Sequence, residues 1–323
     1  DGIRDPLWSR GLGDVYKRQM LFQIIKGGKM LSKSQLAILY MIASVACFSI
    51  MDIIVKYLKD APFGQVLFMR FAFGMIPIIL LIPRKKVFTF YKTKRPGLHA
   101  WRAIWGAIAI VALFIGIRNV PLADCISLTF LGPVFVTILS SLFLGEKIRM
   151  TRISAIILGI IGGLIIIKPT FHEFNLFYFM PLIFAFGFAQ VALSIKSLSK
   201  TEPNYLIAFY FSLLSMLIGL ATIVNGWIWP SLYETFLFVV LGLAGGYANI
   251  LLTQSLRMAD TGLVTPIKYL SLVFAASAGY FIFGEALKLT TLIGAAFIVV
   301  GTYIIFRREQ ILKKQVVPPR YET

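Results

Sequence analysis

The sequence predicts an all-α membrane protein of about ten transmembrane helices, arranged as two inverted five-helix repeats. The first reason is composition: 58% of the 323 residues are hydrophobic and only 14% are charged, which is more apolar surface than a water-soluble domain can bury. The second is the division of the chain into apolar runs of about 20 residues, the length that crosses a bilayer as a helix. The third is an internal repeat.

The repeat is a short signature that occurs twice: an Ala-Asp pair, an apolar run and a Gly-Glu pair. Its acids are Asp124 and Glu146 in the first copy, and Asp260 and Glu285 in the second. Chance similarity between apolar helices would explain shared Leu and Ile but not these polar ends. Each half holds five spans, so the two halves insert in opposite directions, as in many secondary transporters.

The ten expected spans lie near residues 35–58, 66–82, 98–117, 124–144, 153–167, 176–194, 205–224, 235–255, 261–283 and 290–305. The first ends at the turn 62–64, and the second ends at Pro83 and the basic residues that follow it. Pro121 divides the third from the fourth, and Pro169 closes the fifth. Proline ends these runs because it lacks the backbone N–H that would continue a helix.

In the second half, charged or turn residues separate the spans. Lys196 marks the end of the sixth, Asn225 and Gly226 follow the seventh, and Arg257 follows the eighth. Gly284 and Glu285 divide the ninth from the tenth.

The chain is accordingly divided into a leader (1–34), a first repeat (35–168), a second repeat (175–308) and a cytoplasmic basic tail (309–323). Residues 1–19 are charged and carry no apolar core or cleavage site, so they are not a signal peptide, and we expect them to be non-native.

The loop lysines and arginines predict the orientation. With the N-terminus inside, the loops after even-numbered spans hold most of the basic residues: Arg84, Lys85, Lys86, Lys92, Lys94, Arg95, Lys147, Arg149, Arg152, Lys196, Lys200 and Arg257. The opposite loops hold four. We therefore expect a multi-pass protein of the inner membrane with both termini in the cytoplasm. The net charge of +18 comes from these loops, so we expect no nucleic-acid partner.

Several stretches resemble the EamA-domain transporters of the drug/metabolite transporter superfamily. They are residues 121–124 (Pro-Leu-Ala-Asp), 130–135, 144–147 (Leu-Gly-Glu-Lys) and 283–285, together with Arg70 in the second span. The second copy has Arg257-Met258 where many relatives have proline. The resemblance covers residues 35–308. It implies a ten-helix transporter of a small organic metabolite that works by alternating access, and it does not choose among amino acids, flavins or S-adenosylmethionine.

The sequence lacks the motifs of several other protein classes. No phosphate-binding loop, HExxH or GxSxG sequence occurs, so we expect neither an ATPase nor another enzyme, no catalytic residues and no cofactor. No His/Cys cluster has metal-ligand spacing. The alternatives are a membrane-embedded transferase, which would need clustered carboxylates or a histidine, and a lipid- or partner-binding scaffold. A homodimer is compatible with the two GxxxG motifs, at Gly159 and Gly242, although packing within the chain explains them as well.

Charges within spans are costly, by about 2.5 to 3.5 kcal/mol on insertion scales, and usually face a cavity or a partner. Asp52 and Lys56 lie four residues apart, which puts them on one helix face. They form either a self-neutralising pair or a coupling site in which Asp52 carries a proton or holds a substrate amine. Arg102, near the inner end of the third span, is expected to reach the interface.

Arg70 and Lys268 are the cations expected to bind an anionic or zwitterionic solute together. Pro266 bends the ninth span, so that Lys268 and Tyr269 face the cavity or else serve packing. Trp105, with Trp101, Phe130, Tyr247 and Tyr269, would stack a flat ring or simply pack.

Asn249, with Gln190 and Gln254, needs a hydrogen-bond partner that is either solute or another helix. Glu146 and Glu285 are expected to anchor span ends, or to act in gating.

Overall fold

A computed structural model describes residues 32–82, 91, 93–144, 150–167, 175–198, 201–259 and 264–316, and these contain helices and no strands. The leader up to residue 31, Glu146, Asp260 and the tail from residue 317 lie outside the described residues. The helices are α2 (Lys33–Tyr57), α3 (Phe63–Leu80), α4 (Pro96–Asn119), α5 (Leu122–Thr129), α6 (Gly132–Leu144), α7 (Met150–Ile167), η2 (Leu176–Tyr178), α8 (Phe179–Leu198), α9 (Asn204–Ala221), η3 (Thr222–Asn225), α10 (Leu232–Met258), η4 (Thr265–Tyr269), α12 (Leu270–Phe283) and α13 (Leu289–Val316).

The helix ends follow from local sequence. α2 begins at a capping box, in which the Ser32 hydroxyl accepts the Gln35 N–H and the Gln35 side chain accepts the Ser32 N–H. α10 also begins at a capping box, formed by Ser231 and Glu234. α12 ends at Gly284, whose φ of 65° lies in the left-handed region that glycine adopts without steric cost.

Seven helical segments of the described chain are long and apolar enough to cross a membrane. Three shorter apolar helices, Ile153–Ile167, Ile267–Phe283 and Leu289–Ile304, add to them. The protein is therefore an all-helical, multi-pass membrane protein.

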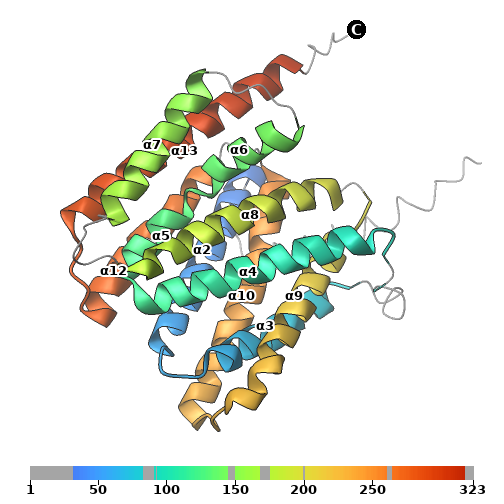
Figure 1. Ribbon diagram of the computed structural model, residues 1–323. Coiled ribbons are helices and arrows are strands. Elements are labelled where there is room, and N and C mark those ends of the chain that lie inside the picture. The colour runs from blue at the N-terminus through green and yellow to red at the C-terminus, as the bar shows by residue number, and fades with distance from the viewer. Residues whose placement is uncertain are drawn as a thin grey trace, which may run out of the picture.

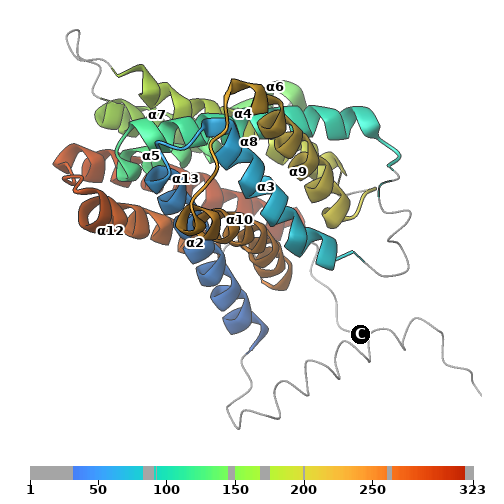
Figure 2. The same ribbon diagram turned by 90° about the horizontal axis from the view of Figure 1, so that it is seen from below.

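The helices pack in pairs that join the two halves of the chain. α2 packs on α10, α4 on α8, α3 on α9, α5 on α12 and α7 on α13. Figure 1 shows α7 beside α13 at one edge of the bundle and α3 beside α9 at the other. Figure 2 shows α2 against α10 and separates α12 from α3. Each of these pairs joins one helix of the first half to one of the second.

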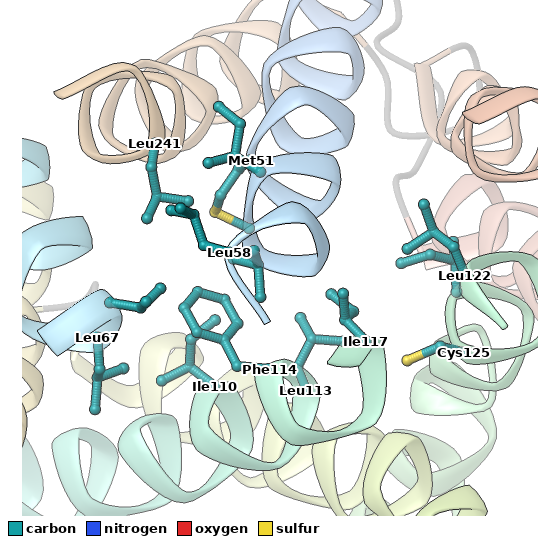
Figure 3. Packing of buried hydrophobic residues seen from close by; sticks show 14 of the residues in the cluster. Met51, Leu58, Leu67, Ile110, Leu113, Phe114, Ile117, Leu122, Cys125 and Leu241 are labelled. Carbon is teal, nitrogen blue, oxygen red and sulfur yellow. The ribbon is translucent and has the colours of Figure 1, made fainter. Parts of the chain in front are cut away.

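The largest buried apolar cluster lies among α2, α3, α4, α5, α10 and α12. Figure 3 shows Phe114 and Ile117 of α4 facing Leu58, which caps the end of α2, with Leu122 and Cys125 of α5 at one side. Phe114 and Ile117 are completely buried. This cluster fixes the ends of α2 and α4 against the start of α5.

Close helix contacts confirm that the GxxxG motifs serve packing within the chain. A Cβ added to Gly246 of α10 would lie 2.7 Å from the carbonyl oxygen of Gly74 in α3. A Cβ on Gly159 of α7 would lie 2.9 Å from the Val134 side chain. Both distances are too short for any side chain, so glycine is required where these helices touch.

Two expected spans are not continuous helices. The fourth span divides into α5 and α6 at Phe130 and Leu131, just before Pro133, and the ninth begins as the 3-10 helix η4 before α12. The tighter η4 turn holds Pro266 in its first turn, a position where proline is tolerated because the N–H it lacks would have no partner within the helix.

Candidate functional site

The two interrupted spans meet at their breaks. The Phe130 ring, between α5 and α6, lies 5.0 Å from the Tyr269 ring at the start of α12. The Thr302 hydroxyl of α13 lies 3.2 Å from the carbonyl oxygen of Phe130 and 2.8 Å from the Ile298 carbonyl oxygen of its own helix, so the two acceptors share its one proton. Irregular backbone within a membrane occurs where it lines a cavity or is covered by protein, so this junction is a candidate site.

Asp52 lies beside this junction, in a small cavity. The cavity has a volume of about 10 Å³ and is lined by Ser49, Asp52, Ile53, Leu122, Ile126, Ser271 and Ala275, from α2, α5 and α12. Asp52 is 9% exposed, and its Oδ1 atom has no hydrogen-bond partner. Such a volume is about the size that holds one water, so the carboxylate adjoins a small space inside the bundle.

Arg70 is the charged group whose field acts on Asp52, although no ion pair joins them within the described chain. It is 4% exposed on α3, and its guanidinium stacks on the Phe71 ring at 4.2 Å. A Cβ on Gly245 of α10 would lie 2.7 Å from a guanidinium nitrogen, so the glycine makes room for the cation. The Nε atom of Arg70 remains without a partner.

Lys56 does not pair with Asp52, and that expectation is wrong. Its ammonium forms an ion pair with Glu285, from the turn after α12, and donates to the Val120 carbonyl oxygen at 2.7 Å. Glu285 in turn accepts the Leu122 N–H, at the first residue of α5, at 2.8 Å. We call Lys56, Val120, Leu122 and Glu285 the Lys56 cluster. It joins α2, the start of α5 and the α12–α13 turn at one end of the bundle, and it confirms Glu285 as an anchor of helix ends.

Asp124 is a polar anchor whose role the sequence did not reveal. It is 3% exposed in the first turn of α5, where it accepts hydrogen bonds from the Tyr178 hydroxyl at 2.7 Å and the Thr291 hydroxyl at 2.5 Å. Tyr178 and Thr291 belong to the second half of the chain. The repeated Ala-Asp pair was the sequence feature that pointed to Asp124.

The other expected solute-binding residues are distributed over the bundle. Lys268 is half-buried in η4, next to Tyr269, whose hydroxyl is 3.5 Å from the Val299 carbonyl oxygen. The Trp105 ring packs 5.5 Å from the Phe186 ring between α4 and α8. Asn249 is exposed on α10 and donates to the Gly245 carbonyl oxygen of its own helix at 2.9 Å. Their contact with a solute stays a prediction.

Arg102 does not reach the interface, and the expectation that it would is wrong. Only 8% of it is exposed, and its guanidinium stacks on the Phe211 ring of α9 at 4.2 Å. Its Nε and Nη1 atoms have no partner. His99, one turn earlier on α4, is 2% exposed and has no partner on either ring nitrogen.

The described residues hold no group of three His, Cys, Asp or Glu side chains that could bind a metal ion. Cys47 and Cys125 are both free thiols.

Comparison with known proteins agrees with this architecture. The chain is 29% identical to an S-adenosylmethionine uptake transporter of Rickettsia bellii, over 86% of the chain and 96% of the relative. It is 28% identical to a pseudopaline exporter of Pseudomonas aeruginosa, over 90% of the chain and all of the relative. A riboflavin transporter of Rhizobium johnstonii is 26% identical, over 86% of the chain and 93% of the relative.

A solved crystal structure has the same fold, with a TM-score of 0.58 and 18% identity over 86% of this chain and 98% of its own. The family model for EamA-like transporters matches residues 35–168 and again 175–307. These relatives are transporters and not enzymes. The chain belongs to the EamA-like transporter family.

Proposed function

We propose that the protein is a secondary transporter that moves a small organic solute across the inner membrane by alternating access. Ten spans, counting α5 and α6 as one and including the three shorter helices, would form two inverted repeats, 35–168 and 175–308. The loop charges favour both termini in the cytoplasm. The carrying observation is the pair Asp52 and Arg70: both are buried, each has an unpartnered atom, and a cavity lies beside Asp52.

A charged pair without direct contact is costly inside a membrane bundle, so a solute that satisfies both groups would be stabilised there. A zwitterion has that chemistry, with its cationic part toward Asp52 and its anionic part toward Arg70. Lys268, beside the broken start of α12, adds a second cation. S-adenosylmethionine, which a relative is named for, is such a zwitterion.

Alternating access requires an end of the bundle that opens. We propose that the Lys56 cluster closes the end that the loop charges place outside. Its ion pair joins α2 of the first half to the α12–α13 turn of the second, and Glu285 also holds α5. Rocking of one half against the other would break these contacts and expose the cavity at Asp52.

The test is ligand stabilisation of the purified protein, because a ligand that binds the folded state raises its melting temperature. We expect a zwitterionic solute from a panel of S-adenosylmethionine, amino acids, riboflavin and organic anions to raise it. Arg70→Gln and Lys268→Gln should each weaken that binding about tenfold or more while leaving the folded protein in the membrane. Asn119→Ala, at an exposed residue near the α4–α5 turn, is the control.

If no solute in the panel binds, or if both variants bind the solute as tightly as the parent, the proposed site is wrong.

A further inference from the structure

Arg102 is a second buried cation, and it lies away from the cavity at Asp52. It belongs to α4, two turns from the end that carries the α3–α4 and α8–α9 connections. Thr93 and Lys94 of the first connection contact Glu202 of the second, so these two connections lie together. We call this end of the bundle the Glu202 end, and the loop charges predict that it is cytoplasmic.

No carboxylate balances Arg102 within the described chain. The described residues form one ion pair, Lys56 with Glu285, which belongs to the opposite end. Glu202, the acid whose charge acts on His99, already accepts the Thr93 hydroxyl and the Lys94 N–H, both at 2.9 Å. An unpaired charge buried away from water costs several kcal/mol, so this guanidinium favours an anion from outside the chain.

Unpartnered donors occur on Arg102, on a neighbouring residue of α4 and on one residue of α9. The Nε and Nη1 atoms of Arg102 are free, and so are both ring nitrogens of His99, three residues earlier on the same face of α4. Ser215, completely buried and one turn after Phe211 on α9, has a hydroxyl without a partner. Carboxylate and phosphate oxygens accept hydrogen bonds from such groups: the N–H of a guanidinium or imidazole and the O–H of a hydroxyl.

A row of stacked groups connects this position with Arg70. Arg70 lies on the Phe71 ring and Arg102 on the Phe211 ring, each at 4.2 Å, and the two rings meet edge to face at 5.2 Å. Two cations therefore flank one aromatic pair, one toward the centre of the bundle and one toward the Glu202 end.

We propose that Arg102 and His99 form a second anion-binding site, which takes an oxyanion at the Glu202 end of the bundle. The oxyanion is either a free ion such as phosphate or the carboxylate of the transported solute. In the second case the site rests on the proposed function, and the anionic group passes from Arg70 along the aromatic pair to Arg102. Arg102 would then position the solute where it leaves or enters the bundle.

The experiment measures the melting temperature of the purified protein against three ligands at constant ionic strength: sodium phosphate, sodium acetate and S-adenosylmethionine. Sodium chloride is the reference salt. We expect phosphate or acetate to stabilise the parent more than chloride does, and Arg102→Gln to weaken that effect at least tenfold. Arg102→Lys, which keeps the charge but not the forked geometry, should retain part of it. The control is Lys59→Gln, at an exposed lysine in the turn after α2, which should retain the phosphate effect.

A second readout separates binding from a structural role. Without added oxyanion, Arg102→Gln should melt no lower than the parent, because it removes an unpaired buried charge. A clear drop in its melting temperature would make Arg102 a structural residue.

The outcomes also separate the two possible sources of the oxyanion, a free ion and the transported solute. Loss of phosphate and acetate stabilisation in Arg102→Gln assigns a free oxyanion, and loss of the S-adenosylmethionine effect alone assigns the carboxylate of a solute. The proposal is overturned if Arg102→Gln binds all three ligands like the parent, or if none of them stabilises the parent beyond chloride. The phosphate arm needs no transported solute, so its failure is distinct from failure of the proposed function.

Discussion

At the scale of single residues, Asp52 and Lys56 lie one turn apart on α2 but have different surroundings. Lys56 contacts Glu285 and the Val120 carbonyl in its cluster, and its ammonium also lies 5.6 Å from the Phe283 ring. Asp52 has a free Oδ1 atom beside a cavity. A group that gains and loses a proton during transport needs such a space, whereas Lys56 is held in place.

Asp52→Asn is therefore expected to separate coupling from binding. In vesicles, uphill uptake driven by a pH gradient should be lost, because asparagine cannot carry the proton, while exchange of solute across the membrane continues. Asp60→Asn, at an exposed loop position, is the control. Gradient-driven uptake that survives in Asp52→Asn would rule out the coupling role.

Glu202 gives a pH dependence of stability at the Glu202 end. Burial raises the pKa of this carboxyl, but hydrogen bonds from the Lys94 N–H and the Thr93 hydroxyl, with nearby His99 and Lys94, lower it by more, so its pKa lies below its ordinary value of 4.5. A carboxyl whose pKa is lower in the folded state than in the unfolded state stabilises the fold at pH values above its unfolded pKa. This contribution disappears as the pH falls through the folded pKa. Hydrogen bonds to a charged group contribute about 2 kcal/mol.

We expect Glu202→Gln to lower the melting temperature at pH 7 and to approach the parent as the pH falls below 4.5. Glu234→Gln, at the capping box of α10 on the far side of the bundle, is the comparison for a local helix-end effect. An equal difference in melting temperature between the parent and Glu202→Gln at pH 7 and below pH 4.5 would contradict the assigned hydrogen bonds.

The sequence identified the costly charges but not their partners. Asp52 and Arg70 stand out because charge is rare in apolar runs, and both are buried as that cost implies. The spacing of Asp52 and Lys56 suggested a local pair, but the partner of Lys56 comes from a turn more than two hundred residues later. Arg102 was misjudged for a similar reason, because Phe211, from the other half, holds it inside.

At the scale of elements, the α12–α13 turn explains why glycine precedes glutamate there. Gly284 adopts a left-handed conformation, and the Glu285 N–H then bonds back to the Gly279 carbonyl at 2.8 Å. The chain thereby reverses, and the Glu285 carboxylate reaches Lys56 and α5.

Gly284→Ala should cost about 1 to 2 kcal/mol of backbone strain and loosen the Lys56 cluster. The matched control is Gly226→Ala, because Gly226 has a φ of 79° in a loop without close neighbours. Both variants should melt lower, but only Gly284→Ala should speed reaction of Cys125, which is completely buried in α5, with an impermeant maleimide. The measurement uses a Cys47→Ser background. Equal labelling of Cys125 in the two variants would show that the turn does not control access.

The breaks within the fourth and ninth spans show the limit of reading elements from an apolar run. Pro266 gave a signal for the irregular start of the ninth span. The fourth span is apolar on both sides of Phe130, and Gly132 and Pro133 were its helix-breaking residues. Hydropathy records how much of a segment is apolar, and it does not record where the backbone leaves the helical path.

At the scale of the whole molecule, composition and the repeat were sufficient for the fold class, because membrane thickness and backbone hydrogen bonding allow few alternatives. The pairing of helices was not predictable, since apolar faces in lipid do not specify which neighbour they choose.

The orientation has a direct test. Reporter fusions after Pro169 and after Gly226 are expected to read outside, whereas a fusion after Arg95 should read inside, because the basic loops stay in the cytoplasm. A cytoplasmic reading at either Pro169 or Gly226 would overturn the inverted-repeat topology.

The pairing of helices across the two halves has a consequence for biosynthesis. α2 and α3 leave the ribosome carrying Asp52 and Arg70, but α10, which packs on both, begins only at Leu232. At about 5 to 20 residues per second, the nascent chain waits roughly 10 to 35 seconds between the end of α2 and the start of that helix. During this interval the early helices hold their charges without their final neighbour, so insertion machinery or early contact with α4 has to shelter them from lipid until the second half arrives.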